Sequence, residues 1–292
     1  MRSFLAEFPV ECPTRLDEAL ETLARHAGTP GGATPLAGAT DLYVPLNAGQ
    51  LPATTFVSLH GVQELAAAPA WNGDVYRLHA LSTYADCRRD PQVARRLPLL
   101  VAAARELGAL QIQNRGTWAG NIANASPAAD GVPVLLAYDA TLELASVRGR
   151  RTVPLDGYFT GYKKTLRAPD ELIVAIDVRV PAAGARHFFR KVGTRRLQAI
   201  SKVVAAGVLE RDAAGTVTAA RLALGSVAPV TLRARQAEAA IVVRRLDAAL
   251  GADAARAVEA DIAPIDDVRS TRDYRRRIAG RLVAAFVAPD SA

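Results

Sequence analysis

The chain has 292 residues, half of them hydrophobic, so it is too long for one small core and suits about two or three compact units. No apolar run reaches the roughly 18–20 residues of a membrane-spanning helix, and no secretory signal pattern opens the chain, so we expect a cytoplasmic protein. The net charge of +7 comes without abundant aromatic residues or a nucleic-acid-binding module, so we expect an anionic cofactor or an acidic partner subunit rather than nucleic acid.

The first segment, about 1–55, is predicted to form a strand, a helix and a second strand. Thr14 stands three residues before Asp17, a pattern typical of a helix N-cap. Gly28 and the pair at 31–32 end this helix, and its apolar stripe is Leu16, Ala19, Leu20 and Leu23. A short strand at 35–37 follows and leads into a glycine-containing loop.

The second segment, about 56–178, is predicted to alternate short strands with one clear helix. Alanine and leucine dominate 97–107, which predicts that helix. Alternating or continuous apolar residues predict four strands, at 55–59, 76–80, 141–145 and 172–178.

Proline and glycine at 181–184 indicate a linker before the last segment, about 185–292. Strands are expected there near 187–192, 201–210 and 216–227, followed by helices near 235–250, 252–259 and 270–288. Strands followed by helices favour an α+β unit.

The two cysteines, Cys12 and Cys87, lie far apart and form no CxxC motif. An iron–sulfur cluster normally needs about four thiolates, so this chain cannot hold one by itself. No histidine pair has ligand spacing and no Ser-His-Asp arrangement is visible. We therefore predict no metal site and no catalytic residue in the chain.

Two loops rich in small residues carry the chemistry, at 36–42 and at 114–130. A phosphate group can approach backbone N–H groups closely where side chains are small, and successive N–H groups form anion-binding nests. Neither loop is a GxGxxG or a GxxxxGK[ST] motif. On composition alone, Gly38 and Gly120 would be ordinary turn glycines.

Together the loops show a more specific pattern. Leu-Ala-Gly-Ala-Thr-Asp-Leu at 36–42 and Gly-Thr-Trp-Ala-Gly-Asn-Ile-Ala-Asn-Ala-Ser-Pro-Ala-Ala-Asp at 116–130 resemble the two FAD loops of molybdenum hydroxylase flavoprotein (medium) subunits. This family includes xanthine dehydrogenases and carbon monoxide dehydrogenases. The stretches at 156–173 and 189–203 also resemble the family, so the resemblance covers nearly the whole chain.

The resemblance implies an α+β chain with an FAD-binding PCMH-type, vanillyl-alcohol-oxidase-like fold of two subdomains, followed by a C-terminal α+β flavoprotein domain. The FAD-binding domain would span 1–180, with subdomains of about 1–55 and 56–180. The C-terminal domain, like that of carbon monoxide dehydrogenase flavoproteins, would span 185–292.

The resemblance also assigns residues to FAD. The first loop would wrap the diphosphate, the second would line its other side, Ile173 would touch the adenine or ribose end, and Lys191 would reach the flavin. The position of Leu107 is where the family stacks an aromatic residue, a contact that leucine does not reproduce. The full expected set is Leu36, Ala37, Gly38, Ala39, Thr40, Asp41, Leu42, Leu107, Gly108, Thr117, Gly120, Asn121, Asn124, Ser126, Asp130, Ile173 and Lys191.

Two alanines depart from the family pattern. Ala39 and Ala119 stand where the family often has glycine. Because alanine tolerates only negative φ at little cost, both positions are expected to avoid the left-handed region.

The resemblance implies non-covalent FAD, since histidine and cysteine, the family's attachment residues, are absent from both loops. A large molybdenum-cofactor subunit and a small subunit with [2Fe–2S] clusters would be partners, in a heterotrimer or a dimer of heterotrimers. Electrons would pass through FAD to NAD+ or another acceptor, in a xanthine dehydrogenase-like enzyme. The alternatives are a stand-alone FAD-dependent oxidoreductase of small molecules and a non-catalytic scaffold subunit.

Two basic pairs have competing interpretations. The pair at 163–164 could steer a nicotinamide cofactor, but a solvated loop is preferred. The pair at 195–196 could contact phosphates or the iron–sulfur partner, or form surface salt bridges.

Overall fold

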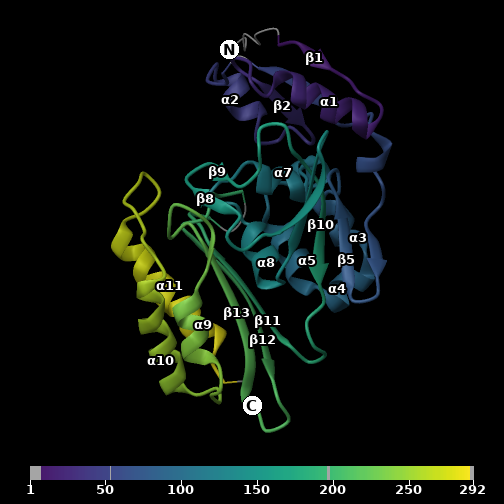
Figure 1. Cartoon of the computed structure of the whole chain (residues 1–292). Helices are drawn as coiled ribbons and strands as arrows, with labels where there is room; N and C mark the ends of the chain where they lie inside the picture. The colour runs from purple at the N-terminus through teal and green to yellow at the C-terminus, as the bar shows by residue number, and fades with distance from the viewer. Residues whose placement is uncertain (1–7, 53, 196–197, 290–292) are drawn as a thin grey trace.

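A computed structural model describes residues 8–52, 54–195 and 198–289, so Arg196 and the first seven residues lie outside the described part. Figure 1 shows three parts in succession: the N-terminal part, a central part that carries most of the helices, and a C-terminal sheet with its own helices. Among the described residues, no helix is long and apolar enough to cross a membrane.

The N-terminal part is a parallel three-stranded sheet in the order β1-β3-β2, with α1 packed on it. Its elements are β1 (Val10–Glu11), α1 (Leu16–His26), β2 (Ala33–Leu36), α2 (Tyr43–Asn47) and β3 (Thr55–Ser58). The predicted apolar stripe of α1 is buried, as expected.

The start of α1 differs from the prediction by one residue. Arg15, not Thr14, is the N-cap. The Glu18 carboxylate accepts hydrogen bonds from the backbone N–H groups of Thr14 at 2.9 Å and Arg15 at 3.2 Å. Glu18 therefore turns back to the two amides that precede the helix, as the acidic residue of a capping box does.

The central part is an antiparallel five-stranded sheet in the order β4-β5-β10-β6-β7. Its strands are β4 (Ala70–Asn72), β5 (Val75–His79), β6 (Thr141–Ser146), β7 (Gly149–Pro154) and β10 (Leu172–Arg179). Of the four strands predicted between 55 and 178, three are found in this sheet as β5, β6 and β10, whereas the one at 55–59 is β3 of the N-terminal sheet. The 3-10 turn η1 (Gln63–Leu65) precedes β4, and a two-stranded hairpin of β8 (Phe159–Gly161) and β9 (Lys164–Thr165) precedes β10.

The central part holds more helices than the one predicted. The predicted helix is α5 (Pro98–Glu106), but the segment also contains α3 (Tyr84–Arg89), α4 (Pro91–Arg96), α6 (Leu110–Arg115), α7 (Trp118–Ala123) and α8 (Val132–Ala137). Each additional helix has only six residues, which is too short for a periodic apolar pattern to show. Capping side chains start three of them, at Thr83, Asp90 and Thr117.

The C-terminal part is an antiparallel sheet in the order β11-β12-β13-β14, formed by β11 (Arg186–Val192), β12 (Val203–Arg211), β13 (Val217–Gly225) and β14 (Leu232–Arg233). Successive residues of a strand face opposite sides. Val204 and Ala206 accordingly join the core shared with the central part, where β11, β12 and β13 pack on α5 and α8. Val203 and Ala205 face a second core.

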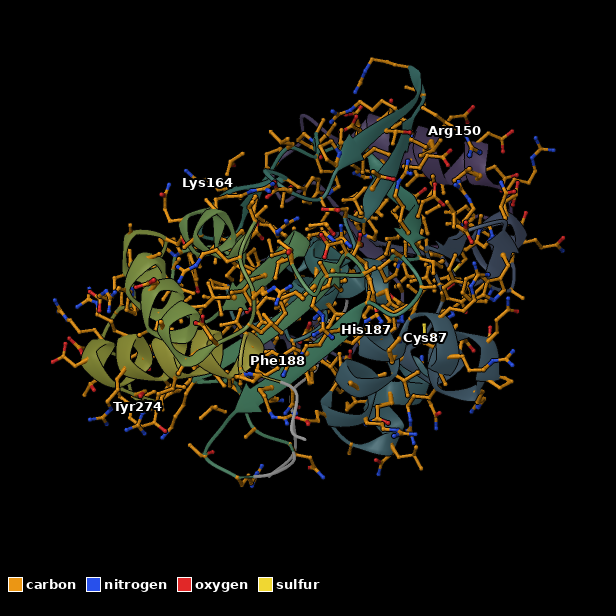
Figure 2. The ribbon with its side chains drawn as sticks, turned by 90° about the horizontal axis from the view of Figure 1, so that it is seen from below. Cys87, Arg150, Lys164, His187, Phe188 and Tyr274 are labelled. Atoms are coloured by element: carbon orange, nitrogen blue, oxygen red, sulfur yellow. The ribbon has the colours of Figure 1, made fainter. Side chains whose placement is uncertain are left out.

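That second core lies under α9 (Arg235–Ile241), α10 (Ala248–Ala257), the 3-10 turn η2 (Val258–Ala260) and α11 (Arg272–Phe286). Phe188 lies where the sheet meets these helices, with its ring 5.8 Å from that of Phe286 (Figure 2). The helix predicted near 235–250 was too long. It ends at Ile241, and Asp247 starts α10 by accepting a hydrogen bond from the Leu250 amide at 2.6 Å.

Candidate functional site

A cleft of about 370 Å³ opens where β2 ends, beside α7 and the start of β10. This volume is within the range of small-molecule and cofactor sites, roughly 300–1,000 Å³. The lining residues are Thr34, Pro35, Ala37, Gly38, Ala39, Thr40, Asp41, Leu42, Leu59, Ala80, Tyr84, Thr117, Ala119, Gly120, Asn121, Ala123, Asn124, Lys163, Arg167, Glu171, Leu172 and Ile173.

The two glycine-containing loops meet in this cleft. A β-carbon built on Gly38 would lie 1.8 Å from the carbonyl oxygen of Arg115 and 3.1 Å from the α-carbon of Gly116. The backbone of the first loop therefore passes directly against the backbone that leads into the second. Only glycine permits so close an approach.

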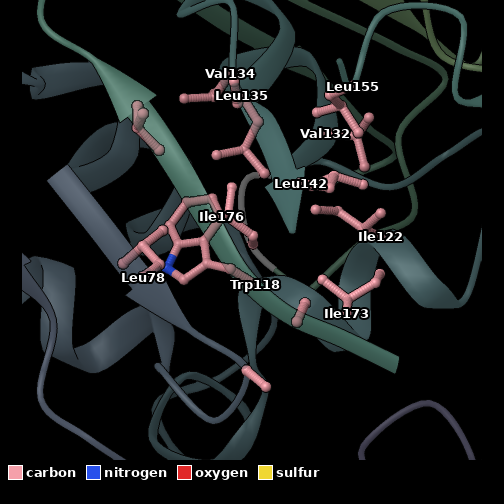
Figure 3. Packing of buried hydrophobic residues seen from close by; sticks show 14 of the residues in the cluster. Leu78, Trp118, Ile122, Val132, Val134, Leu135, Leu142, Leu155, Ile173 and Ile176 are labelled. Atoms are coloured by element: carbon pink, nitrogen blue, oxygen red, sulfur yellow. The ribbon is translucent and has the colours of Figure 1, made fainter. Parts of the chain in front are cut away.

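Helix α7 has large residues on the side that packs in the core and small residues on the side that lines the cleft. Trp118 and Ile122 are fully buried and pack with Ile173 and Ile176 of β10 (Figure 3). Three small residues of the same helix, Ala119, Gly120 and Ala123, line the cleft. Packing by the large residues thus holds the helix against the sheet, while the small residues leave its backbone accessible to a ligand.

Four consecutive backbone donors of the cleft have no partner in the described part of the chain. Within the described ranges, the backbone N–H groups of Gly38, Ala39, Thr40 and Asp41 have no acceptor in the protein. Thr117 caps α7 by accepting from the Gly120 amide at 3.0 Å. Successive free amides in a turn with small side chains suit an anion with several oxygens, such as a diphosphate.

Asn121 lines the cleft, but its side-chain oxygen is enclosed by the protein. It is 9% exposed, and its Oδ1 atom is buried without a hydrogen-bond partner among the described residues. A buried amide without a partner is costly, by about 1–3 kcal/mol. Because the protein itself encloses this oxygen, the fit to an anionic cofactor rests on the free amides at 38–41 and on the close contact of the two loops at Gly38.

A chain of three polar side chains crosses one side of the cleft. The Asn124 Nδ2 atom donates to Asp41 Oδ2 at 2.9 Å. The Lys163 ammonium donates to the carbonyl oxygen of Asn124 at 2.7 Å and to its Oδ1 atom at 2.6 Å. The preferred interpretation of the pair at 163–164 as part of a solvated loop agrees with the exposure of Lys163 in the turn between β8 and β9, although its ammonium also binds Asn124 at the cleft. Lys164 is exposed.

The start of β10 is fixed by charged groups on the other side of the cleft. Arg151 donates to both carboxylate oxygens of Glu171, at 2.6 and 2.7 Å, and this hydrogen-bonded guanidinium lowers the pKa of Glu171. Arg167 donates to the carbonyl oxygen of Glu171 at 2.6 Å. These bonds position the backbone just before Ile173.

A second, buried cluster lies outside the cleft lining. The Lys191 ammonium forms an ion pair with Asp130 at 2.6 Å and donates to the carbonyl oxygen of Glu106 at 3.1 Å. The Ser201 hydroxyl donates to the same carboxylate. The two charged side chains are only 4% and 7% exposed. Burial raises the pKa of Asp130, and the neighbouring Lys191 opposes that shift.

Of the seventeen expected site residues, eleven line the cleft, two form the buried cluster, and four belong to neither. Those that line the cleft are Ala37, Gly38, Ala39, Thr40, Asp41, Leu42, Thr117, Gly120, Asn121, Asn124 and Ile173. Asp130 and Lys191 form the buried cluster, and Leu107 and Gly108 directly follow Glu106. Leu36 ends β2, and Ser126 accepts from the Ala128 amide at 3.3 Å. The assignment of each residue to FAD stays a prediction.

The cluster and the cleft are adjacent at one point. A β-carbon on Gly131, the residue after Asp130, would lie 2.8 Å from the Oδ1 atom of Asn121. Asn121 lines the cleft, so the turn that carries Asp130 lies directly behind a lining residue.

The backbone at Ala39 corrects one expectation. Its φ is +62°, in the left-handed region, whereas Ala119 lies within helix α7 as expected. The turn needs this conformation because the chain reverses between β2 and α2, where the Ala39 carbonyl accepts from the Tyr43 amide at 2.9 Å. A left-handed alanine costs about 1–2 kcal/mol.

Replacing these two alanines with glycine should therefore have opposite effects. Ala39→Gly removes the strain and is expected to raise the free energy of unfolding by about 1 kcal/mol. Ala119→Gly weakens helix α7 and should lower the free energy of unfolding by about 1 kcal/mol. Urea unfolding of both variants measures the difference, and equal effects of the two substitutions would contradict the conformations described.

Sequence reasoning missed several lining residues. Tyr84, Leu59 and Ala80 come from elements far apart in the chain, and no local pattern marks them. Arg167 and Glu171 both precede the expected Ile173, and an arginine four residues before an acidic one is a signal that could have been used.

Comparison with known proteins agrees with this geometry. Residues 6–183 match the family model described as the FAD binding domain in molybdopterin dehydrogenase, and residues 188–289 match the CO dehydrogenase flavoprotein C-terminal domain. The fold and the cleft thus define an FAD-binding flavoprotein with an α+β architecture. The chain belongs to the family of FAD-binding medium subunits of molybdenum hydroxylases.

Relatives and solved structures support this membership. The chain is 32% identical to a putative xanthine dehydrogenase FAD-binding subunit of Escherichia coli (strain K12), over 82% of each chain. It is 32% identical to the carbon monoxide dehydrogenase medium chain of Hydrogenophaga pseudoflava, over 77% of this chain and 75% of that one. A solved carbon monoxide dehydrogenase from the same organism superposes with a TM-score of 0.91, covering 97% of this chain and 96% of the other.

Proposed function

We propose that this chain is the electron-transferring flavoprotein subunit of a molybdenum-containing hydroxylase. Its partners would be a large subunit with the molybdenum cofactor and a small subunit with [2Fe–2S] clusters, in a heterotrimer or a dimer of heterotrimers. The chain would pass electrons from those clusters to NAD+ or another acceptor. The single observation that carries the proposal is the convergence of the two family loops on one cleft.

The residues of the cleft fit FAD, and each group has a distinct part in holding it. The free amides at 38–41 would bind the diphosphate, and the small residues of α7 would allow its close approach. The backbone before Ile173, fixed by Arg151 and Arg167, would position the adenine or ribose end. Bound FAD supplies the two-electron chemistry, and the protein supplies placement and electrostatics.

The cysteine content supports the division between subunits. Cys87 is buried and Cys12 is exposed, and the sequence holds no others, so the clusters must be on another chain. The stretch at 156–166 resembles xanthine dehydrogenases most, and we propose a xanthine dehydrogenase-like enzyme within the family. A cytoplasmic location is part of the same proposal.

The rival function is a stand-alone flavin oxidoreductase that acts on a small molecule by itself. Purification of the chain alone and together with the two partner subunits separates the functions. We expect a yellow chain that oxidises no substrate alone, and substrate-dependent NAD+ reduction only by the complex. Turnover of a small alcohol by the isolated chain would overturn the proposal, and a colourless chain would favour a scaffold.

A further inference from the structure

The turn between β8 and β9 carries a lysine that reaches the cleft from a third segment of the chain. Lys163 has a φ of +56°, in the left-handed region, so the turn holds it in a conformation that L-residues rarely adopt. Its ammonium makes two hydrogen bonds, both to Asn124, at 2.6 and 2.7 Å. In Figure 1 the β8–β9 hairpin lies beside α7, which ends just before Asn124.

Asn124 is shared between two partners. Its Oδ1 atom accepts from Lys163, which leaves its Nδ2 atom to donate to Asp41 in the first loop. Because the lysine can only donate, it fixes which end of the amide faces the aspartate. The three residues, which we call the Asp41–Asn124–Lys163 latch, tie together segments that are 39 and 83 residues apart in sequence.

We propose that Lys163 is a positioning residue that retains the cofactor: through Asn124 it fastens the β8–β9 turn and the first loop across the cleft, so that release of FAD requires the latch to open. The proposal rests on the FAD site proposed above. It adds a residue to that site which the loop motifs do not contain.

Charge explains why a lysine serves better here than a neutral donor. Among the described lining residues, the basic ones are Lys163 and Arg167, and one Arg167 nitrogen already donates to two backbone carbonyls, of Ala168 and Glu171. An ammonium has three donors, and two of them are used by Asn124. Because hydrogen bonds from a charged donor are roughly twice as strong as neutral ones, the ammonium holds Asn124 more firmly than a neutral donor would.

The test measures the rate of FAD release from the full chain. Free FAD regains its fluorescence when it leaves the protein, so dilution into excess scavenger gives the dissociation rate directly. We expect Lys163→Met to release FAD about 10- to 100-fold faster, the size that hydrogen bonds to a charged group confer. Lys163→Arg should restore most of the retention, because it keeps the charge and the donors.

Lys164→Met is the matched control, since Lys164 is the next residue, has the same charge and lies at the periphery of the molecule in Figure 2. It should release FAD at the wild-type rate. Asn124→Ala should match Lys163→Met, and the double variant should be no faster than Asn124→Ala alone, because the lysine acts through the asparagine.

Two results would overturn the inference. One is a release rate for Lys163→Met equal to that of Lys164→Met. The other is additive acceleration in the double variant, which would mean that the two residues act independently. Both require a wild-type chain that binds FAD, whereas a wild-type chain that binds none would refute the FAD site itself.

Discussion

Gly38→Ala is expected to lower the affinity of the chain for FAD by at least about 100-fold while the rest of the molecule stays folded. The added methyl carbon would lie 1.8 Å from the Arg115 carbonyl oxygen, far inside van der Waals contact. Both sides of this contact are backbone, so no side chain can rotate away. Overpacking of this kind costs about 1–3 kcal/mol, and the rigid backbone on both sides places this site at the upper end.

The affinity for FAD falls because the two loops must move apart to relieve this overlap. The two loops can separate only by moving their backbones, and these backbones carry the free amides and the cap of α7. Titration of the apoprotein with FAD, followed by flavin fluorescence, gives the affinity. Gly28→Ala is the matched control, because nothing lies within 4 Å of a β-carbon at that position. Equal affinities of the two variants would show that the loops do not have to touch.

Lys191→Met is expected to lower the free energy of unfolding by about 3–5 kcal/mol. The substitution would leave the Asp130 carboxylate buried with only the Ser201 hydroxyl as a side-chain partner, and an uncompensated buried charge has about this cost. The Glu106 carbonyl would also lose its donor. Urea unfolding at neutral pH measures the change.

A double-mutant cycle separates the ion pair from the packing around it. Asp130→Asn removes the charge that Lys191→Met would strand, so the double variant should be more stable than Lys191→Met alone. Lys202→Met is a suitable control, since the Lys202 ammonium lies 5.2 Å from the centre of the Tyr274 ring and forms no ion pair among the described residues. A loss below about 1 kcal/mol for Lys191→Met would contradict the buried pair.

The sequence allowed the long, periodic elements to be predicted and missed the short ones. The stripe of α1, the helix α5 and the strands β5, β6 and β10 each contain enough residues for a repeating apolar pattern. The six-residue helices α6 and α7 do not, although both shape the cleft. Their starts depend on caps and on contacts with distant segments, which a single sequence does not display.

The site was predictable where small residues follow one another in a motif. The loops at 36–42 and 116–124 supplied ten of the lining residues that were expected. The left-handed Ala39 was not predictable, because composition favours the ordinary region for alanine and only the turn between β2 and α2 imposes the other. The contact of Lys163 with Asn124 depends on the β8–β9 hairpin, whose position relative to α7 is a property of the fold.

The central claim is that the free amides at 38–41 and the small residues of α7 converge on the diphosphate of one FAD. Parallel titrations of the apoprotein with FAD and with FMN test it most directly, because FMN has the same flavin but lacks the diphosphate and the adenosine. The account predicts one FAD per chain and FMN binding at least about 100-fold weaker. FMN binding as tight as FAD binding, or a folded chain that stays colourless with FAD, would contradict it.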